Sequence, residues 1–391
     1  LFFFASAMKI TRVETLKMNP KHVPTQGLGE VAYSWVCIHT DTGLVGYGET
    51  FPVPEAETSI IHSKLANVLL GEDPFNTELL WKRMFSTVNW WGWAGAECRA
   101  LSAVDIALWD LKGKALQQPV YNLIGGKFRD RIRTYNTCYN DEFDFLTDAD
   151  QLATSLLNKG ITAMKIWPFD GAGKANNGNF ISNAQLQQGL DPVRRIRAAV
   201  GDQMDIMIEG HGLWNLPTSV RIAKALEPYN VAWLEEMLPQ DHLPSFRRLR
   251  EQVVQPLIIS ERLMGKWAYA QLLQQQASDI IMLDISWCGG LTEALKIAAL
   301  ADSHQLPIAP HNCSGPFTHQ ANVHLGTAVP NLFVLESVQT HYLKEYPSLV
   351  TDVAVPDADG CFHPPEGVGL GTRLKPEIMA AMEVTVSDLR K

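Results

Sequence analysis

Seven ionisable residues follow short apolar runs in the second half of the chain. They are Lys165, Glu209, Glu235, Glu261, Asp284, His311 and Glu336. From Glu209 onward, subtraction gives steps of 26, 26, 23, 27 and 25 residues, a spacing that fits one strand, one helix and two loops. Charged residues often follow strands because loops are solvated. Seven in register favour one shared mouth at the carboxyl ends of a parallel barrel, where barrel enzymes carry their chemistry.

Three of the seven residues are glutamates on successive strands. Converging carboxylates repel and raise one another's pKa unless a cation joins them. Oxygen-only ligands favour Mg²⁺, or Mn²⁺, over zinc. We therefore predict a metal site of Glu209, Glu235 and Glu261. Strand alternation sends the adjacent Glu236 to the opposite side from Glu235, so we expect Glu236 to form a salt bridge instead.

The other members of the series supply acid–base groups. Asp284 beside His311 would orient the imidazole and raise its basicity, as expected of a general base. Lys165 is either a base with a lowered pKa or a cation that holds substrate charge. If burial raises the pKa of Glu336, that acid would donate a hydrogen bond to a developing oxyanion. The alternative for each residue is an ordinary surface side chain.

A second histidine lies close to the first glutamate. His211 follows Glu209 by two residues in IEGHGLWN, and two residues along a strand restore the same face. We predict that His211 is a general acid for a leaving group. A histidine that only binds substrate or supports the metal remains the alternative.

The elements that position these residues fall into three segments. Residues 8–126 read as an α+β domain, with a hairpin around Asp41-Thr42-Gly43 and a helix in ECRALSAVDIALWDLKGKA. Residues 127–351 alternate strands and helices, which predicts a parallel (β/α)₇β TIM-like barrel. Residues 352–391 are expected to pack back on the first domain.

The barrel assignment rests on eight apolar runs. They are RIRTYNTCYN, TAMKIWPF, MDIMIEGH, VAWLEE, PLIISER, DIIMLDIS, LPIAPHN and LFVLES. The seventh run contains Pro307 and Pro310, and proline is unwelcome in a central strand. Because both prolines lie near the ends of the run, we keep it as a strand.

Composition excludes some classes of protein. The 391 residues carry a formal net charge of −9 and no Lys/Arg run, so nucleic acid is a poor partner. No apolar stretch approaches the roughly 20 residues that span a bilayer. Six scattered cysteines without a CxxC pair suggest reduced thiols in a cytoplasmic protein. We interpret LFFFASA as an extension before Met8, with a cleaved or truncated export signal as the alternative.

At these residues the chain resembles the enolase superfamily, and most closely its mandelate racemase-like branch. The motifs are SAVDIALWDLKGKALQQPVYNLIGG, MKIW, IEG, WLEEM, ISERL, DISWCGGLTEALKIA, PHNCSG and VLES. The resemblance implies a capping domain on the barrel, Mg²⁺ bound to the substrate carboxylate, and an enediolate formed by α-proton abstraction. It also implies the roles given above to the three glutamates, Asp284, His311 and Glu336, and a homo-oligomer, commonly a dimer or octamer.

The sequence departs from this pattern at two positions. Racemases of the branch typically carry Lys-x-Lys at the second strand, but Trp167 stands in the second lysine's place, and tryptophan accepts no proton. Glu209 replaces the usual Asp. The Glu-x-His pattern at residues 209–211 is similar to that of acid-sugar dehydratases, in which the matching histidine assists departure of the β-leaving group.

We therefore expect a sugar-acid substrate and β-elimination. A free hydroxyl as leaving group would give dehydration to a 2-keto-3-deoxy acid. A 3,6-anhydro sugar acid such as anhydrogalactonate would instead undergo ring-opening cycloisomerisation. The alternatives are a carboxylate racemase or epimerase, and a non-catalytic carboxylate-binding barrel. Trp90, Trp91, Trp93 and Trp167 suggest aromatic walls for a sugar ring, and Trp167 and Asn312 are expected to contact the substrate.

Overall fold

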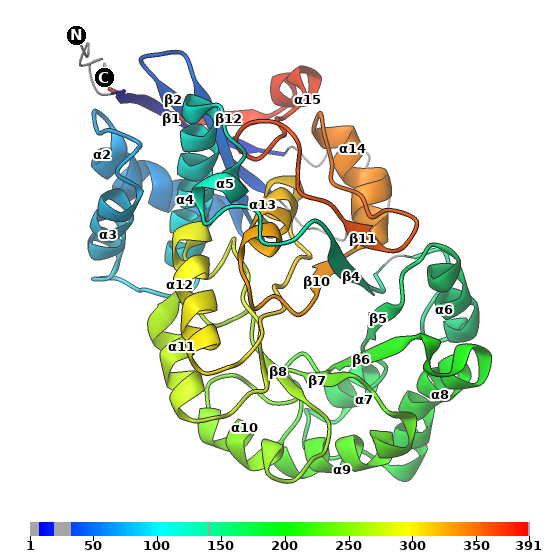
Figure 1. The fold of residues 1–391 in the computed structure, drawn as a ribbon. Coiled ribbons are helices and arrows are strands. Elements are labelled where there is room, and N and C mark those ends of the chain that lie inside the picture. Colours follow the sequence, from blue (N-terminus) through cyan, green and yellow to red (C-terminus); the bar gives the residue numbers. More distant parts are fainter. Residues whose placement is uncertain (1–7, 19–32, 140, 390–391) are drawn as a thin grey trace.

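The computed structural model describes residues 8–18, 33–139 and 141–389. The interpretation of LFFFASA falls on residues outside this part of the chain. Figure 1 shows an antiparallel sheet with its helices beside a ring in which strands line the inside and helices cover the outside. This arrangement confirms the predicted α/β TIM-like barrel with a capping domain.

The capping sheet has the order β12-β1-β2-β3. Strands β2 and β3 pair antiparallel across residues 41–44, which confirms the hairpin. The last strand comes from the tail and pairs antiparallel with β1, so the chain's end completes the sheet of its beginning. The strands are β1 (Ile10–Lys17), β2 (Ser34–Thr40), β3 (Val45–Thr50) and β12 (Glu383–Asp388).

Helix α4 (Ala96–Leu116) packs directly on β3 and confirms the predicted helix. The two elements approach closely because β3 has glycines on the contact face. A Cβ added at Gly48 would lie 2.0 Å from the Ala103 carbonyl oxygen, and one at Gly46 would lie 2.2 Å from that of Ala107. The other helices of the capping domain are α1 (Pro54–Ile60), η1 (Ile61–Leu65), α2 (Ala66–Leu69), α3 (Thr77–Val88) and α5 (Val120–Leu123).

We expect Gly48→Ala to lower the free energy of unfolding by about 1–3 kcal/mol, the usual cost of overpacking a core. The clash is with helix backbone, which cannot rotate away as a side chain can. Urea unfolding of the whole chain measures the change. Gly171→Ala is the control, because nothing lies within 4 Å of its added Cβ. Equal urea midpoints for the two variants would contradict the close packing.

The barrel strands are parallel and follow the order β10-β4-β5-β6-β7-β8-β9. Buried side chains inside the ring include Tyr135, Met207, Trp233 and Ile258, so the ring is a packed core rather than a pore. The strands are β4 (Ile132–Thr137), β5 (Ala163–Ile166), β6 (Asp205–Glu209), β7 (Trp233–Glu235), β8 (Leu257–Ile259), β9 (Ile280–Ile281) and β10 (Leu335–Ser337).

The seventh run forms isolated bridges instead of a continuous strand. Ile308 bridges Ile281 on one side and Leu332 on the other, and thereby closes the ring between β9 and β10. The Ile308 amide donates to the Asn331 carbonyl at 2.9 Å. Two residues later, Pro310 has no amide hydrogen to donate on that side. The prolines therefore weaken this strand without opening the barrel.

Helices cover the outside of the ring (Figure 1). The hydrophobic core with the most buried residues lies between these helices and the barrel strands. The helices are α6 (Ala149–Asn158), α7 (Asp170–Ala175), α8 (Asn183–Val200), η2 (Gly201–Gln203), α9 (Leu216–Leu226), η3 (Glu227–Tyr229), α10 (Leu243–Arg250), α11 (Gly265–Gln274), α12 (Gly290–Ser303) and α13 (Pro316–Ala328).

The tail contacts both parts of the molecule. Strand β11 (Cys361–Phe362) pairs antiparallel with β4 of the barrel. The Leu370 amide donates to the Asp110 carboxylate of α4 at 2.8 Å. The Gly/Pro-rich segment therefore lies against the barrel as well as the capping domain. The remaining helices are η4 (His341–Glu345), α14 (Tyr346–Leu349) and α15 (Pro376–Ala380).

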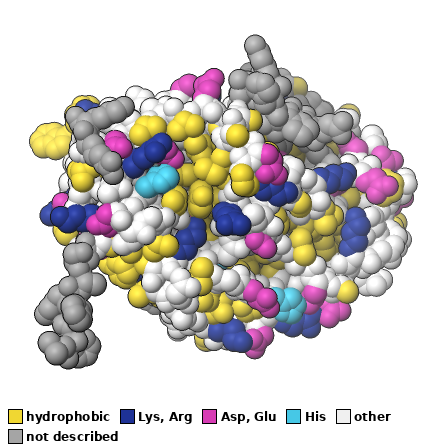
Figure 2. All heavy atoms as spheres, turned by 90° about the horizontal axis from the view of Figure 1, so that it is seen from above, with side chains coloured by type: hydrophobic (Ala, Val, Ile, Leu, Met, Phe, Trp, Pro, Cys, Tyr) yellow, Lys and Arg dark blue, Asp and Glu magenta, His cyan; other side chains and the backbone are white. Residues whose placement is uncertain are grey.

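The face seen in Figure 2 mixes Lys and Arg side chains with Asp and Glu, and hydrophobic side chains lie between them. Among the described helices, none combines the length and apolarity required to cross a membrane.

Candidate active site

The predicted ionisable residues lie at or just beyond the carboxyl ends of their strands. Four of them line one cavity, namely Lys165, Glu209, Glu261 and His311. The other three are fully buried outside its lining, namely Glu235, Asp284 and Glu336. Glu209 and Glu235 end β6 and β7 as direct register partners, and Asp284 bridges His311. The cavity has a volume of about 640 Å³. Its lining comprises Phe51, Thr137, Tyr139, Lys165, Trp167, Asp170, Lys174, Glu209, His211, Leu213, Glu261, Arg262, Trp287, His311, Cys313, Val338 and His341.

The ammonium group of Lys165 lies among three carboxylates. Its Nζ is 2.5 Å from Glu235 Oε1, 2.8 Å from Glu336 Oε1 and 3.5 Å from Glu209 Oε2. Burial opposes its charge, but Glu235 and Glu336 hold the pKa of Lys165 well above its ordinary value. Of the two roles left open for Lys165, this arrangement favours the cation over the base.

Burial and neighbouring carboxylates raise the pKa of Glu209 and of Glu235. Burial raises the pKa of Glu209, and neighbouring Glu261 adds to the rise. Burial and then the charge of Glu209 raise the pKa of Glu235 well above its ordinary value. Carboxylates in this condition gain from a cation that shares them. Within residues 8–18, 33–139 and 141–389, Glu261 Oε2 is buried and has no hydrogen-bond partner, so this oxygen could bind such a cation.

The donor set of Glu209, Glu235 and Glu261 therefore fits a hard divalent cation. The expected convergence is nevertheless incomplete. In the described part of the chain, the three candidate ligand atoms that lie within 4.8 Å of one another belong to His311, Cys313 and Glu336 instead. The Lys165 ammonium occupies Oε1 of Glu235 and would compete with a metal for it.

Glu236 directly follows the end of β7 and has a left-handed backbone, with φ of 37°. Its Oε2 lies 3.2 Å from Arg262 Nε, and its Oε1 accepts a hydrogen bond from Ser260. Burial and the charge of Glu261 raise the pKa of Glu236 well above its ordinary value. The geometry agrees with the expected salt bridge.

His311 and Asp284 form a close pair. His311 Nδ1 is 2.7 Å from Asp284 Oδ2. The aspartate is fully buried, and its Oδ1 accepts from the Ser286 amide and hydroxyl, each at 2.7 Å. Burial disfavours the imidazolium, but Glu336 and the hydrogen bond to Asp284 raise the pKa of His311 well above its ordinary value. A raised pKa makes this imidazole a stronger proton acceptor.

Glu336 differs from the hypothesis made for it. Burial alone would raise its pKa, but the charges of Lys165 and His311 outweigh burial and lower the pKa to about 2. In this arrangement Glu336 is a carboxylate that accepts hydrogen bonds, including one from Thr137. It lies between the Lys165 ammonium and the His311 imidazole.

Asn312 does not line the cavity, contrary to its expected contact with substrate. Its side chain is buried, with 1% exposure. The Asn312 amide donates to Glu336 Oε2 at 2.7 Å, and its Nδ2 donates to the Glu336 carbonyl at 2.9 Å. Asn312 thus positions Glu336. Its place beside His311 in sequence does not show which way the side chain turns.

His211 reaches the cavity by a different route from the one predicted. Strand β6 ends at Glu209, and His211 adopts a left-handed backbone with φ of 48°. Its amide donates to Glu209 Oε1 at 2.6 Å, and its Nδ1 lies 2.9 Å from Asp170 Oδ2. The side chain therefore shares the cavity because of a turn and a carboxylate partner, not because of strand alternation.

Aromatic side chains line the cavity, but they are not those of the tryptophan-rich loop. Trp167 packs edge-on against His211, with ring centroids 5.7 Å apart. Trp287 lies 5.6 Å from the His311 ring and donates from its indole nitrogen to the Phe51 carbonyl at 3.1 Å. The expected walls at Trp90, Trp91 and Trp93 are instead 87%, 65% and 43% exposed, outside the cavity lining.

Several lining residues were missed by sequence reasoning. Arg262 directly follows Glu261, and Trp287 lies three residues after Asp284. Their closeness in sequence to predicted site residues could have indicated that both lie near the cavity. Asp170 is the first residue of α7 and is recognised only by its contact with His211. Phe51 comes from the capping domain, and no spacing in the sequence connects it to the barrel.

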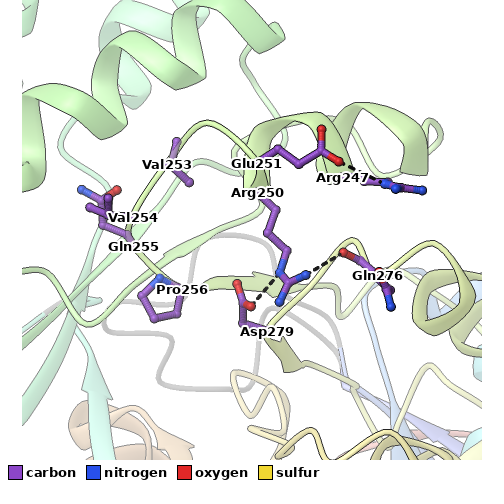
Figure 3. Close-up of a pocket in the computed structure, with 9 residues that line it drawn as sticks. All are labelled: Arg247, Arg250, Glu251, Val253, Val254, Gln255, Pro256, Gln276 and Asp279. Carbon is purple, nitrogen blue, oxygen red and sulfur yellow. Dashed lines mark hydrogen bonds and ion pairs between the residues drawn. The ribbon is translucent and has the colours of Figure 1, made fainter.

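A second hollow of about 490 Å³ lies at the opposite ends of the strands (Figure 3). Pro256 and Asp279 in its lining immediately precede β8 and β9. Its charges pair with one another: Arg250 Nε is 2.7 Å from Asp279 Oδ1, and Arg247 Nε is 3.2 Å from Glu251 Oε1. Groups at this end of a barrel usually serve stability.

Comparison with known families agrees with this architecture. The family model described as the mandelate racemase/muconate lactonizing enzyme N-terminal domain matches residues 7–125. The model described as enolase C-terminal domain-like matches residues 148–378. Together they cover the capping helices and the barrel from α6 onward.

Individual relatives cover nearly the whole chain. It is 30% identical to a D-galactonate dehydratase of Ralstonia nicotianae over 98% of this chain and 96% of that protein. It is 31% identical to a D-xylonate dehydratase of Haloferax volcanii over 88% and 84% of the two chains. A solved enolase of the mandelate racemase subgroup from Agrobacterium tumefaciens is 42% identical, with a TM-score of 0.88 over 98% and 99% of the chains. The chain belongs to the enolase superfamily, in its mandelate racemase/muconate lactonizing enzyme branch.

Proposed function

We propose that this protein is a Mg²⁺-dependent lyase or isomerase that removes the α-proton of a sugar-acid carboxylate and then expels the β-oxygen. One observation carries the proposal. Two imidazoles, each held by an aspartate, line the same cavity as a group of buried glutamates. One imidazole can accept a proton while the other donates one, which is what β-elimination requires.

Each residue of the site has a role that follows from its position. His311 takes the α-proton at Nε2, because its Nδ1 is held by Asp284. Lys165 adds positive charge beside the developing oxyanion. When bound by Glu209, Glu235 and Glu261, Mg²⁺ would act as a Lewis acid on the substrate carboxylate. His211 gives a proton to the departing β-oxygen, with Asp170 fixing its ring.

The arrangement around Trp167 argues against the racemase or epimerase alternative. Inversion at carbon needs a base on each face, and the position of the second lysine holds an indole packed between Phe145 and His211. The raised pKa of Lys165 leaves it a poor proton acceptor. A single strong base, His311, fits elimination better than inversion.

The relatives support a sugar acid as the substrate. Those quoted above are named for D-galactonate and D-xylonate, and a further relative is named D-gluconate dehydratase. If the expelled oxygen is a free hydroxyl, the product is a 2-keto-3-deoxy acid. If the oxygen closes an anhydro ring, as in 3,6-anhydrogalactonate, the same proton transfers open the ring and no water is lost.

Incubation of a sugar-acid library with the protein and Mg²⁺ tests the proposal. We expect 2-keto-3-deoxy acids, or ring-opened keto acids from anhydro substrates, with deuterium entering from D₂O. Exchange at Cα without any elimination product would show an epimerase or racemase instead. Binding of sugar acids without exchange would show a non-catalytic carboxylate-binding barrel.

We expect His211→Asn to separate the two halves of the reaction. Deuterium exchange at Cα should continue, because His311 is untouched, while the rate of β-elimination should fall by about 10²–10⁴, the usual contribution of an acid–base group. Exchange by NMR and keto-acid formation are measured on the same sample. His242→Asn is the control, since this exposed histidine contacts Ser245 outside the cavity. An equal loss of exchange and elimination would contradict the role of His211.

A further inference from the structure

The proposed reaction leaves one nucleophilic side chain of the cavity without a use. Cys313 lines the cavity beside His311 and Glu336. One ligand atom from each of these three residues lies within 4.8 Å of the others. The set offers nitrogen, sulfur and oxygen, whereas the three glutamates offer oxygen alone. Sulfur and imidazole ligands suit zinc, and Mg²⁺ avoids them.

We propose that Zn²⁺, or another thiophilic divalent cation, binds between His311, Cys313 and Glu336 and blocks the cavity. The site is separate from the oxygen site proposed for Mg²⁺, and its occupancy does not depend on which reaction the protein carries out. Occupation would cover His311 Nε2, the atom proposed to accept the α-proton. The cation is therefore expected to act as an inhibitor that excludes substrate.

The imidazole is already oriented for a metal. Asp284 holds His311 Nδ1 at 2.7 Å, which leaves Nε2 facing the cluster, 3.9 Å from Glu336 Oε2. Carboxylate–histidine–metal arrangements of this kind fix the ring and raise its affinity as a ligand. Ligand atoms around tetrahedral zinc lie about 3.5 Å apart, so the side chains need to close by about 1 Å.

The carboxylate and the thiol set the chemistry of binding. Lys165 contacts Glu336 Oε1, whereas Oε2 accepts from the Asn312 amide and lies 3.9 Å from His311 Nε2. A metal at the cluster would use the remaining lone pair of Oε2. The nearby ammonium repels a cation, and the site therefore depends on the thiolate of Cys313. Burial raises the pKa of Cys313 to about 11. The zinc–sulfur bond must form as the thiol proton leaves to solvent, and no electrons are transferred.

Protection of the thiol from alkylation tests the proposal with the wild-type chain and the metal alone. Protein in excess Mg²⁺ is treated with iodoacetamide, with and without Zn²⁺, and the modified peptides are measured by mass spectrometry. Cys361 is the internal reference, because it is also partly exposed and lies outside the cavity. We expect Zn²⁺ at about ten or more times its dissociation constant to slow alkylation of Cys313 by at least about tenfold and to leave Cys361 unchanged, because only the metal-free thiolate reacts.

A matched pair of variants locates the zinc. Calorimetry with Zn²⁺ in excess Mg²⁺ should show about 10–100-fold weaker binding to Cys313→Ser and unchanged binding to Cys361→Ser. Unchanged binding to Cys313→Ser would place the zinc on the glutamates and overturn the proposal. Equal alkylation rates of Cys313 with and without Zn²⁺ would also overturn it. Neither measurement requires turnover, so failure here is distinguishable from failure of the proposed elimination.

Discussion

His311→Asn is expected to lower the rate of α-proton exchange by about 10²–10⁴, the usual contribution of a general base. Asparagine keeps a polar group beside Asp284 but cannot take up the proton. Exchange of the substrate's α-hydrogen with D₂O, followed by NMR, measures this step without regard to elimination. Because elimination follows proton removal, keto-acid formation should fall by the same factor.

The pH profile of exchange adds a second test of the same residue. Contact with Asp284 and Glu336 raises the pKa of His311, so the unprotonated base is reached only at higher pH than for a free histidine. The exchange rate should therefore rise with pH, with its midpoint above about 6.5, the ordinary histidine value. Asp284→Asn should move that midpoint down.

An exposed histidine serves as the control for His311. His363 contacts Asp357 at the molecular surface, and His363→Asn should exchange at the wild-type rate. If His311→Asn kept full exchange while His363→Asn behaved as wild type, another group would be the base.

The series of charged strand ends could be predicted from sequence because its cause is regular. Each strand–helix unit returns the chain to the same mouth, so the spacing alone brings Glu209, Glu235 and His311 together. The hairpin and helix α4 could also be predicted, because turn residues and helical spacing are local features of the sequence. The barrel topology therefore follows from the repeated strand–helix unit, and its prediction required no knowledge of contacts between distant residues.

Features that depend on a single tertiary contact could not be predicted from the sequence. His211 enters the cavity through a left-handed turn and a bond to Asp170, and spacing shows neither. The charge of Glu336 was misjudged because its pKa depends on Lys165 and His311 more than on burial. Three-dimensional neighbours therefore decide the chemistry of these side chains, and strand spacing carries no information on those neighbours.

Substitution of Glu261 by glutamine is expected to remove most of the stabilisation of the protein by Mg²⁺. At a Mg²⁺ concentration 100 times the dissociation constant, binding should raise the free energy of unfolding of the wild type by about 2.7 kcal/mol. Glu261→Gln should lose most of this increment, because an amide oxygen brings no charge to the cation. Chelation of Mg²⁺ should remove the increment and the α-proton exchange from the wild type.

The choice of Glu261 makes this test specific. Among the described residues its Oε2 is buried without a hydrogen-bond partner, and its Oε1 makes a partly exposed ion pair with Arg262 at 3.4 Å. Glu235→Gln would instead break the buried ion pair with Lys165. In the absence of metal, Glu261→Gln should change the free energy of unfolding little, because loss of the Arg262 ion pair is offset by relief of repulsion from Glu209 and Glu236. Glu251→Gln, at an exposed pair with Arg247, is the control. A Glu261→Gln variant with the full wild-type increment would show that Mg²⁺ binds elsewhere, because the loss of a ligand cannot leave the binding energy unchanged.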